Sequence, residues 1–422
     1  MGRVSGRGAE AMKTTIDIET KEVGDWLEWL ARFGKTKSGG VTRLLYDENW
    51  RLAQHSLFQK MKESGLNPYF DGVGNLFGRL EGTDQEEKAI LTGSHIDTVV
   101  DGGKYDGAFG IMASFIAVNY LKKHYGKPKK TVEVVSLCEE EGSRFPLAFW
   151  GSGSVTGKFT KRDCEGLADV RNISFAQAMT SAGLQPDEKQ VKREDIECFI
   201  EIHIEQGAVL EKEQKSIGIV SHIVGQRRFT IKVMGESNHA GTTPMLYRKD
   251  SVHLAAELIT YAIKQVTEID AHLVATVGKI QAVPNIPNVI AKEVTFTLDV
   301  RHHQEEVLDY YCEKIFAYFK QRGKTADMEV GWNQWLDVKA VAMDAKLTQL
   351  SERIVEEIDI PYQKMISGAG HDAQIFGTYC PTALLFVPSV NGISHSPKEH
   401  TKLEDLKNGV VVLIELLHRL AY

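Results

Sequence analysis

Side chains that could bind a metal ion follow several short apolar segments of this chain, and this pattern constrains the fold more than any other feature. Each apolar segment has the length and Val/Ile/Leu content of a buried β-strand, and helical segments separate them. The carboxyl ends of parallel strands meet at one edge of a sheet, where sites gather in α/β proteins. We therefore predict an α/β domain with a mixed, largely parallel sheet, on which these side chains converge. They are His95, Glu140, Glu141, His203 and His395.

Asp106, which lies between Tyr105 and Gly107, adds a further carboxylate to this set. Imidazole nitrogens and carboxylate oxygens are the ligands that zinc and similar divalent ions take. Five of these six side chains would be too many ligands for one ordinary catalytic ion. They suit two ions if one carboxylate binds both. The remaining carboxylate could then act as a general base on the attacking water.

The chain has 422 residues, a length that favours two domains. Between residues 222 and 332 the pattern changes to β-α-β-β-α-β, which is typical of a ferredoxin-like fold. The expected elements are a strand over 228–234, a helix over 251–269, strands over 272–281 and 293–300, a helix over 307–322 and a strand over 328–332. We predict that this α+β unit is inserted into the catalytic domain, because His395 must return to the metal site. The catalytic domain then comprises 20–221 and 333–422, and residues 1–19 are expected to form a disordered leader.

Composition excludes several classes of partner. The net charge is −7 without a basic tract, which argues against a nucleic-acid partner. No apolar run reaches the roughly 18 residues that a membrane helix requires. The five cysteines are odd in number and include no Cys-x-x-Cys pair, which favours reduced thiols and a cytoplasmic location.

Several long motifs resemble the dinuclear-metal amidohydrolases of the aminoacylase and carboxypeptidase G type. Within that family the chain is most similar to the branch of the N-carbamoyl-L-amino acid hydrolases and allantoate amidohydrolases, and it looks closest to the latter over 42–46, 96–100 and 145–150. The resemblance runs from about residue 42 to the C-terminus. The motifs are Glu139–Phe145, His203–Gly207, Gly225–Phe229, Asn238–Met245 and Gly368–Ala373.

The resemblance implies a role for each ligand. One divalent ion would take His95, Asp106 and His203, and the other would take Asp106, Glu141 and His395, with Asp106 as the bridge. The ions would be zinc or manganese, with cobalt or nickel as substitutes in vitro. The family position makes Glu140 the general base, whereas a run of three glutamates is otherwise typical of a solvated turn.

Further roles come from the same resemblance. Asp97 would orient the His95 imidazole from behind, although an Asp at this position could equally cap a turn. His239 would help to hold the oxyanion, and a plain loop is the alternative reading of His239 and Asn288. The residues expected to contact substrate are Gln226, Asn288, Arg301, Gly370 and His371.

The expected activity is hydrolysis of a small ureido acid, foremost allantoate, to ureidoglycine, ammonia and carbon dioxide. An N-carbamoyl-L-amino acid hydrolase is the nearest alternative, because few contacts separate the two specificities. A dinuclear-metal aminoacylase or peptidase and a non-catalytic metal-dependent binding protein are the remaining alternatives. The inserted domain is expected to act as a lid and to form a homodimer, in which His239 reaches the partner's metal site.

Overall fold

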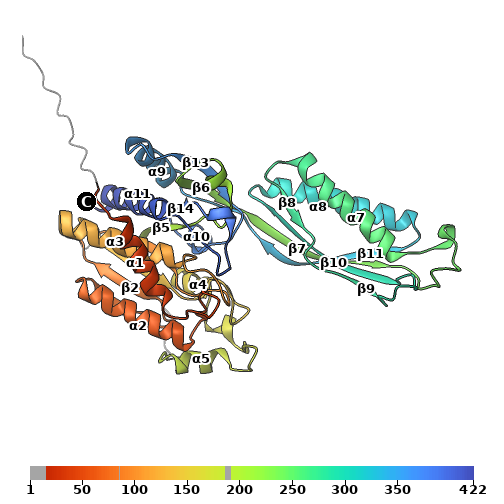
Figure 1. The fold of residues 1–422 in the computed structure, drawn as a ribbon, viewed down its shortest axis with the longest axis horizontal. Coiled ribbons are helices and arrows are strands. Elements are labelled where there is room, and N and C mark those ends of the chain that lie inside the picture. The colour runs from red at the N-terminus through yellow and green to blue at the C-terminus, as the bar shows by residue number, and fades with distance from the viewer. Residues whose placement is uncertain (1–15, 85, 186–191) are drawn as a thin grey trace, which may run out of the picture.

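The computed structural model describes residues 16–84, 86–185 and 192–422, which form two lobes (Figure 1). The larger lobe is built on a nine-stranded sheet, and the elongated second lobe on a separate five-stranded sheet. The chain leaves the first lobe after Ile223 and returns to it at Val341. The second lobe is thus an insertion within the first.

The nine-stranded sheet has the strand order β1-β2-β4-β3-β5-β14-β6-β12, and β13 also pairs with β6. The four neighbours β4, β3, β5 and β14 run parallel to one another, whereas β2 pairs antiparallel with β4, β6 with β14, and the outer strands β1 and β12 with β2 and β6. This is the mixed, largely parallel sheet that the sequence predicts. The strands are β1 (Asn67–Phe70), β2 (Leu76–Leu80), β3 (Ala89–His95), β4 (Val132–Leu137), β5 (Ile196–Ile204), β6 (Ile217–Ile223), β12 (Val341–Ala342), β13 (Tyr362–Ser367) and β14 (Thr382–Val387).

Helices cover both faces of this sheet, because its strands are apolar on both sides. Along β5, Ile200 and Ile202 belong to one hydrophobic cluster, and Phe199 belongs to the cluster on the other face. Helices α1, α3, α9 and α11 pack on the first face, and α4 and α10 pack on the second. The helices of this lobe are α1 (Thr20–Ala31), α2 (Glu48–Glu63), α3 (Ala108–Tyr125), α4 (Trp150–Thr156), α5 (Phe175–Ser181), α6 (Val209–Lys212), α9 (Ala345–Glu357), α10 (Asp372–Phe376) and α11 (Leu403–Ala421).

The inserted lobe has the order β-α-β-β-β-α-β, which is one strand more than predicted, with its sheet arranged β11-β7-β10-β8 and with β9 also paired to β10. Burial alternates strictly along β10, so that one face packs under α7 and α8 while the other face remains open. The elements are β7 (Gly225–Met234), α7 (Ser251–Ile269), β8 (Val274–Thr276), β9 (Ile280–Val283), β10 (Glu293–His302), α8 (Glu305–Thr325) and β11 (Glu329–Val338). The open face is the one that carries polar side chains.

Three predicted boundaries differ from the structure. Of the leader expected over 1–19, residues 1–15 lie outside the described residues, but Ile18 is buried in the core, so packing begins before residue 20. The first and last strands of the inserted sheet are longer than expected, because β7 spans Gly225–Met234 instead of 228–234 and β11 spans Glu329–Val338 instead of 328–332. The single strand expected over 272–281 is two short strands, because the chain leaves its partner β10 around Gly278 and rejoins it at Ile280.

Two further findings bear on the composition-based predictions. All five cysteines are free thiols. Among the residues that the structure describes, no helix combines the length and the apolar character that crossing a membrane requires.

Candidate metal centre

The predicted ligands meet at the carboxyl ends of β3, β4, β5 and β14. His95 is the last residue of β3, the three glutamates follow β4, His203 lies at the end of β5, and His395 is in the loop after β14. Because these four strands are parallel neighbours, their ends deliver all the side chains to one edge of the sheet. Potential ligand atoms come together there in three groups: His95, Asp106 and His203; Asp106, Glu141 and His395; and His95, Glu140 and Glu141.

Asp106 stands at the centre of this arrangement, with one carboxylate oxygen on each side. Its Oδ1 lies 3.3 Å from His95 Nε2 and 3.2 Å from His203 Nε2. Its Oδ2 lies 3.3 Å from His395 Nε2, which is itself 3.3 Å from Glu141 Oε1. Asp106 is thus the shared member of the two ligand groups that the resemblance implies.

The buried histidines present the correct nitrogen to the cluster. His95 Nδ1 is 3.1 Å from the Asp97 carbonyl oxygen, and His203 Nδ1 is 2.9 Å from the Ile204 carbonyl oxygen. A carbonyl only accepts, so each Nδ1 carries the proton and each Nε2 keeps its lone pair for the cluster. The Gly107 N–H points at His203 Nε2 at 3.0 Å, which agrees with an unprotonated Nε2.

Gly107 is needed for this close approach. Its φ is +60°, in the left-handed region, and a Cβ there would lie 2.4 Å from the His95 carbonyl oxygen. The loop that carries Asp106 could not lie against His95 with a larger residue at position 107.

The three glutamates differ in their surroundings. Glu139 is fully buried, and neither of its carboxylate oxygens has a hydrogen-bond partner among the described residues. Glu140 and Glu141 are half-buried and belong to the ligand groups. The prediction that only some of the three face the site is consistent with this placement.

Asp97 is fully buried behind the cluster, but its carboxylate holds the glutamate turn and not the His95 imidazole that it was expected to orient. That carboxylate accepts hydrogen bonds at 3.1 Å from the backbone N–H groups of Glu140 and Glu141. Its Oδ1 lies 3.6 Å from His95 Nδ1, which is beyond hydrogen-bond distance. Asp97 therefore fixes the glutamate turn directly and contacts the imidazole through its backbone carbonyl.

Three polar residues that the sequence reasoning missed hold Asp106 in place. Gln206 Nε2 and Ser394 Oγ donate to Asp106 Oδ2 at 2.7 and 3.0 Å. Buried Glu399 accepts from the backbone N–H of Asp106 at 3.1 Å and from Ser394 Oγ at 2.8 Å. Gln206 lies within the motif His203–Gly207, whereas nothing in the local sequence around Glu399 indicates that its partner is Asp106.

The electrostatics of the site favour a bound cation. Burial raises the pKa of Glu140 well above its ordinary value, and burial together with the charge of Asp106 raises the pKa of Glu141 to about 7. Asp106 Oδ1 is buried and has no hydrogen-bond partner among the described residues. Crowded carboxylates and an orphaned oxygen between two imidazole lone pairs are what a divalent cation would satisfy, so the residues fit a metal centre.

His371 and Gly370 border the same site from the loop between β13 and α10. His371 is buried, and its ring centroid lies 4.6 Å from that of His203. Burial lowers the pKa of His371 well below its ordinary value, so the ring is neutral at physiological pH. Its Nε2 has no hydrogen-bond partner within the described part of the chain, which leaves it available to a ligand.

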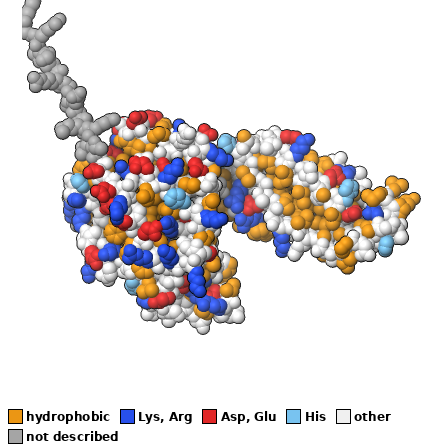
Figure 2. All heavy atoms as spheres, viewed as in Figure 1, with side chains coloured by type: hydrophobic (Ala, Val, Ile, Leu, Met, Phe, Trp, Pro, Cys, Tyr) orange, Lys and Arg blue, Asp and Glu red, His pale blue; other side chains and the backbone are white. Residues whose placement is uncertain are grey.

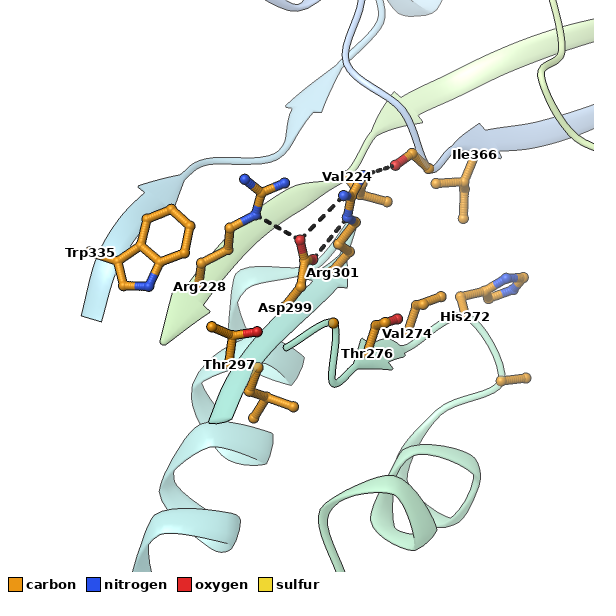
Figure 3. A pocket seen from close by; sticks show the side chains of 14 residues that line it. Val224, Arg228, His272, Val274, Thr276, Thr297, Asp299, Arg301, Trp335 and Ile366 are labelled. Atoms are coloured by element: carbon orange, nitrogen blue, oxygen red, sulfur yellow. Dashed lines mark hydrogen bonds and ion pairs between the residues drawn. The ribbon is translucent and has the colours of Figure 1, made fainter. Parts of the chain in front are cut away.

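Gln226 and Arg301 lie on the open face of the inserted sheet, near the junction of the lobes. They are cross-strand partners on β7 and β10, and both donate to Asp299. Arg301 Nη1 also donates to the carbonyl of Gly368 at 2.8 Å, which links the two lobes beside the loop of His371. A cavity of about 780 Å³ opens at this point, lined by both lobes (Figure 3).

His239 and Asn288 lie together, but the structure does not bring them to the metal ligands of their own chain. His239 forms an isolated bridge with Val289, and the Ala240 N–H donates to the Asn288 carbonyl at 3.0 Å. Both residues are exposed, in the loops that join β7 to α7 and β9 to β10, and these loops lie at the end of the inserted lobe that is remote from the first lobe (Figure 1). Their predicted roles thus require another chain or a different arrangement of the lobes.

Known proteins match this chain in sequence and in fold over nearly its whole length. The allantoate amidohydrolase of Bacillus subtilis (strain 168) is 44% identical over 405 residues, which cover 95% of this chain and 97% of that protein. An N-carbamoyl-L-amino-acid amidohydrolase of Paenarthrobacter aurescens is 34% identical over 93% of this chain and 95% of its own length. A crystal structure of an amidase of the hydantoinase/carbamoylase family from Burkholderia multivorans matches with a TM-score of 0.92 and 31% identity, over 96% of this chain and 98% of that one.

Residues 91–419 match the family described as Peptidase family M20/M25/M40, a span that contains the whole ligand cluster. The expected resemblance to metal-dependent amidohydrolases is thereby confirmed. The chain belongs to the peptidase family M20/M25/M40.

Proposed function

We propose that this protein is a metal-dependent amidohydrolase that cleaves the ureido group of a small ureido acid, foremost allantoate. The observation that carries the proposal is the position of Asp106 between two ligand groups, in a chain 44% identical to an allantoate amidohydrolase. The expected products are ureidoglycine, ammonia and carbon dioxide. The enzyme class is a hydrolase that acts on carbon–nitrogen bonds other than peptide bonds.

Two divalent ions, zinc or manganese, would be held by His95, Asp106 and His203 and by Asp106, Glu141 and His395. When bound, such ions polarise a carbonyl and lower the pKa of water. Cobalt or nickel could substitute in vitro, because the same imidazole and carboxylate ligands accept them.

Glu140 is the residue that we propose moves the proton. Asp97 fixes its backbone, and its carboxylate lies in the ligand cluster without serving either of the two groups that share Asp106. Desolvation raises the pKa of the Glu140 carboxyl above its ordinary value, which is the direction that suits a group that must both take up and release a proton. It would take a proton from the attacking water and deliver it to the leaving nitrogen.

The substrate's remaining groups would be bound by the inserted lobe and by the Gly370–His371 loop. Arg301 presents a guanidinium to the substrate carboxylate, a pairing with good bidentate geometry. Gln226 would serve the second ureido arm, since an amide can match both its donors and its acceptors. Asn288, which lies beside His239, would reach that arm from a partner chain.

An N-carbamoyl-L-amino acid hydrolase is the second candidate, and the 34% identical relative supports it. Both reactions need the same metal ligands and the same carboxylate contact, so the specificity resides in a few side chains. An aminoacylase or peptidase and a non-catalytic binding protein stay weaker alternatives. A spare base at Glu140 serves no purpose in a pure binding protein.

The substrate assignment is tested with purified protein loaded in parallel with zinc, manganese or cobalt. We expect kcat/KM for allantoate to exceed that for N-carbamoyl-L-amino acids by about tenfold or more, which corresponds to roughly 1.4 kcal/mol. The reverse order would identify an N-carbamoyl-L-amino acid hydrolase. No hydrolysis of either substrate by fully metal-loaded protein would contradict the proposal.

Glu140 and Glu141 are separated by their effect on metal content. Glu140→Gln should retain the metal content of the wild type and lower kcat by at least the roughly 10²–10⁴-fold expected for a lost acid–base group. The matched variant Glu141→Gln should lose one metal equivalent, because it removes a ligand. Elemental analysis beside kinetics makes the measurement, and loss of metal from Glu140→Gln would mean that the two roles are exchanged.

We also propose that the protein is a homodimer in which His239 completes the partner's active site. His239 Nδ1 accepts hydrogen bonds from the Gly241 and Thr242 N–H groups at 3.0 and 3.2 Å, so its exposed Nε2 carries the proton and can donate to an oxyanion. Met245, Leu246 and Tyr247 follow in the same loop and are 71–86% exposed. Figure 2 shows further hydrophobic side chains gathered over the inserted lobe, and exposed apolar surface of this kind favours a partner.

Subunit mixing tests the shared site. Chains carrying Glu140→Ala and chains carrying His239→Ala should each be nearly inactive. In a mixed dimer both lesions fall in one site and the other site is intact. With equal mixing, half of the dimers are mixed, so activity should recover to roughly a quarter of wild type.

The matched control mixes Glu140→Ala with Glu141→Ala. Both side chains belong to the same lobe, so every site of a mixed dimer keeps one lesion and no activity should return. If the subunits are shown to exchange but the mixture of Glu140→Ala and His239→Ala recovers no activity, His239 acts in the site of its own chain. That result would refute the shared arrangement.

A further inference from the structure

Asp299 lies at the centre of a cluster of donors on the open face of the inserted sheet (Figure 3). Strand alternation sets this position: odd-numbered residues of β10 lie on the open face of the sheet, and even-numbered ones pack under the helices. Asp299 accepts from Arg301 Nε at 2.9 Å on its own strand. From the neighbouring β7 it accepts from Arg228 Nε at 2.7 Å and from Gln226 Nε2 at 2.6 Å.

The carboxylate of Asp299 is ionised at physiological pH. Burial alone would raise the pKa of Asp299. The hydrogen bonds from Arg301 and Arg228 outweigh this effect and hold the pKa of Asp299 below its ordinary value. An ionised carboxylate only accepts hydrogen bonds. Gln226 must therefore turn its NH₂ group toward Asp299, and its carbonyl oxygen is left to accept from a ureido N–H.

Asp299 also sets the net charge of the cavity. Two guanidinium groups, of Arg228 and Arg301, surround one carboxylate, which leaves a single positive charge. Arg228 contacts Asp299 only through Nε, and its remaining NH₂ groups point away from that carboxylate (Figure 3). The Trp335 ring lies 5.6 Å from this guanidinium, because a bulge in β11 at Trp335 interrupts its pairing with β7.

We infer that Asp299 is a positioning and specificity-determining residue, which orients Gln226 and Arg301 and restricts the site to ureido acids with a single negative charge. This inference rests on the proposed function, because Gln226 and Arg301 are assigned there to substrate. Allantoate and N-carbamoyl derivatives of neutral amino acids carry one carboxylate. A ureido acid with a second carboxylate would need the charge of Arg228, which Asp299 already neutralises.

The test uses two ligands of nearly equal size that differ by one charge, N-carbamoyl-L-aspartate and N-carbamoyl-L-asparagine. Their affinities are measured by calorimetry on metal-loaded protein in the Glu140→Gln background, which prevents turnover. Asp299→Asn should shift the ratio of the two dissociation constants toward the aspartate ligand by about tenfold or more, the effect of one charged contact. A merely structural role would weaken both ligands equally and leave the ratio unchanged.

Glu293→Gln is the matched control. Glu293 lies on the same strand and the same open face, and it pairs with Lys232 at 3.0 Å, but it does not line the cavity. Its substitution should leave the ratio unchanged. An unchanged ratio in Asp299→Asn, or an equal shift in Glu293→Gln, would overturn the inference, as would failure of both ligands to bind.

Arg301→Ala separates this inference from the proposed function. Both ligands carry the α-carboxylate, so both should bind about tenfold or more weakly in that variant. If Arg301→Ala has no effect while Asp299→Asn still shifts the ratio, the assignment of Arg301 to the carboxylate fails, and the charge restriction stands on Arg228. If Arg301→Ala weakens both ligands and Asp299→Asn leaves their ratio unchanged, only the inference about Asp299 fails.

Discussion

The site depends on one carboxylate, that of Asp106, whose two oxygens face different imidazoles. Oδ1 is directed at His95 and His203, and Oδ2 at His395, all within 3.2–3.3 Å. A buried carboxylate among imidazoles and other carboxylates is costly unless each charge finds a partner. A divalent cation on each side would satisfy these atoms together, which is why the remaining features of the site can be understood as support for Asp106.

That support comes from distant parts of the chain. Gly107 allows the Asp106 loop to lie against His95. Glu399 holds the same loop, because its carboxylate accepts a hydrogen bond from the backbone N–H of Asp106. The parallel strands β4, β3, β5 and β14 bring the ligands to one edge, and Asp97 fixes the glutamate turn. The inserted lobe adds a separate set of donors that Asp299 organises. The candidate metal centre and the proposed substrate contacts thus lie on two sheets, each with its own core.

The sequence predicts those parts of the structure that a local pattern encodes. The amphipathic helix over 251–269 has the predicted bounds, and His95, Glu140, Glu141 and His203 lie at or just after the ends of apolar strands, as expected. The prediction of a single strand over 272–281 was wrong, because sequence periodicity cannot show that the pairing with β10 is interrupted at Gly278. Glu399 and Asp299 were missed for a related reason: their roles depend on partners from other segments, and Glu399 lies 293 positions from Asp106. The resemblance supplied residue roles that no local pattern could give.

The most direct test of this account is anomalous diffraction from crystals of the wild-type protein grown with manganese or zinc. We expect two anomalous peaks per chain, one on each side of Asp106, with Oδ1 nearest the ion bound by His95 and His203 and Oδ2 nearest the ion bound by Glu141 and His395. A single peak, or two peaks of which only one contacts Asp106, would contradict the central role of this carboxylate.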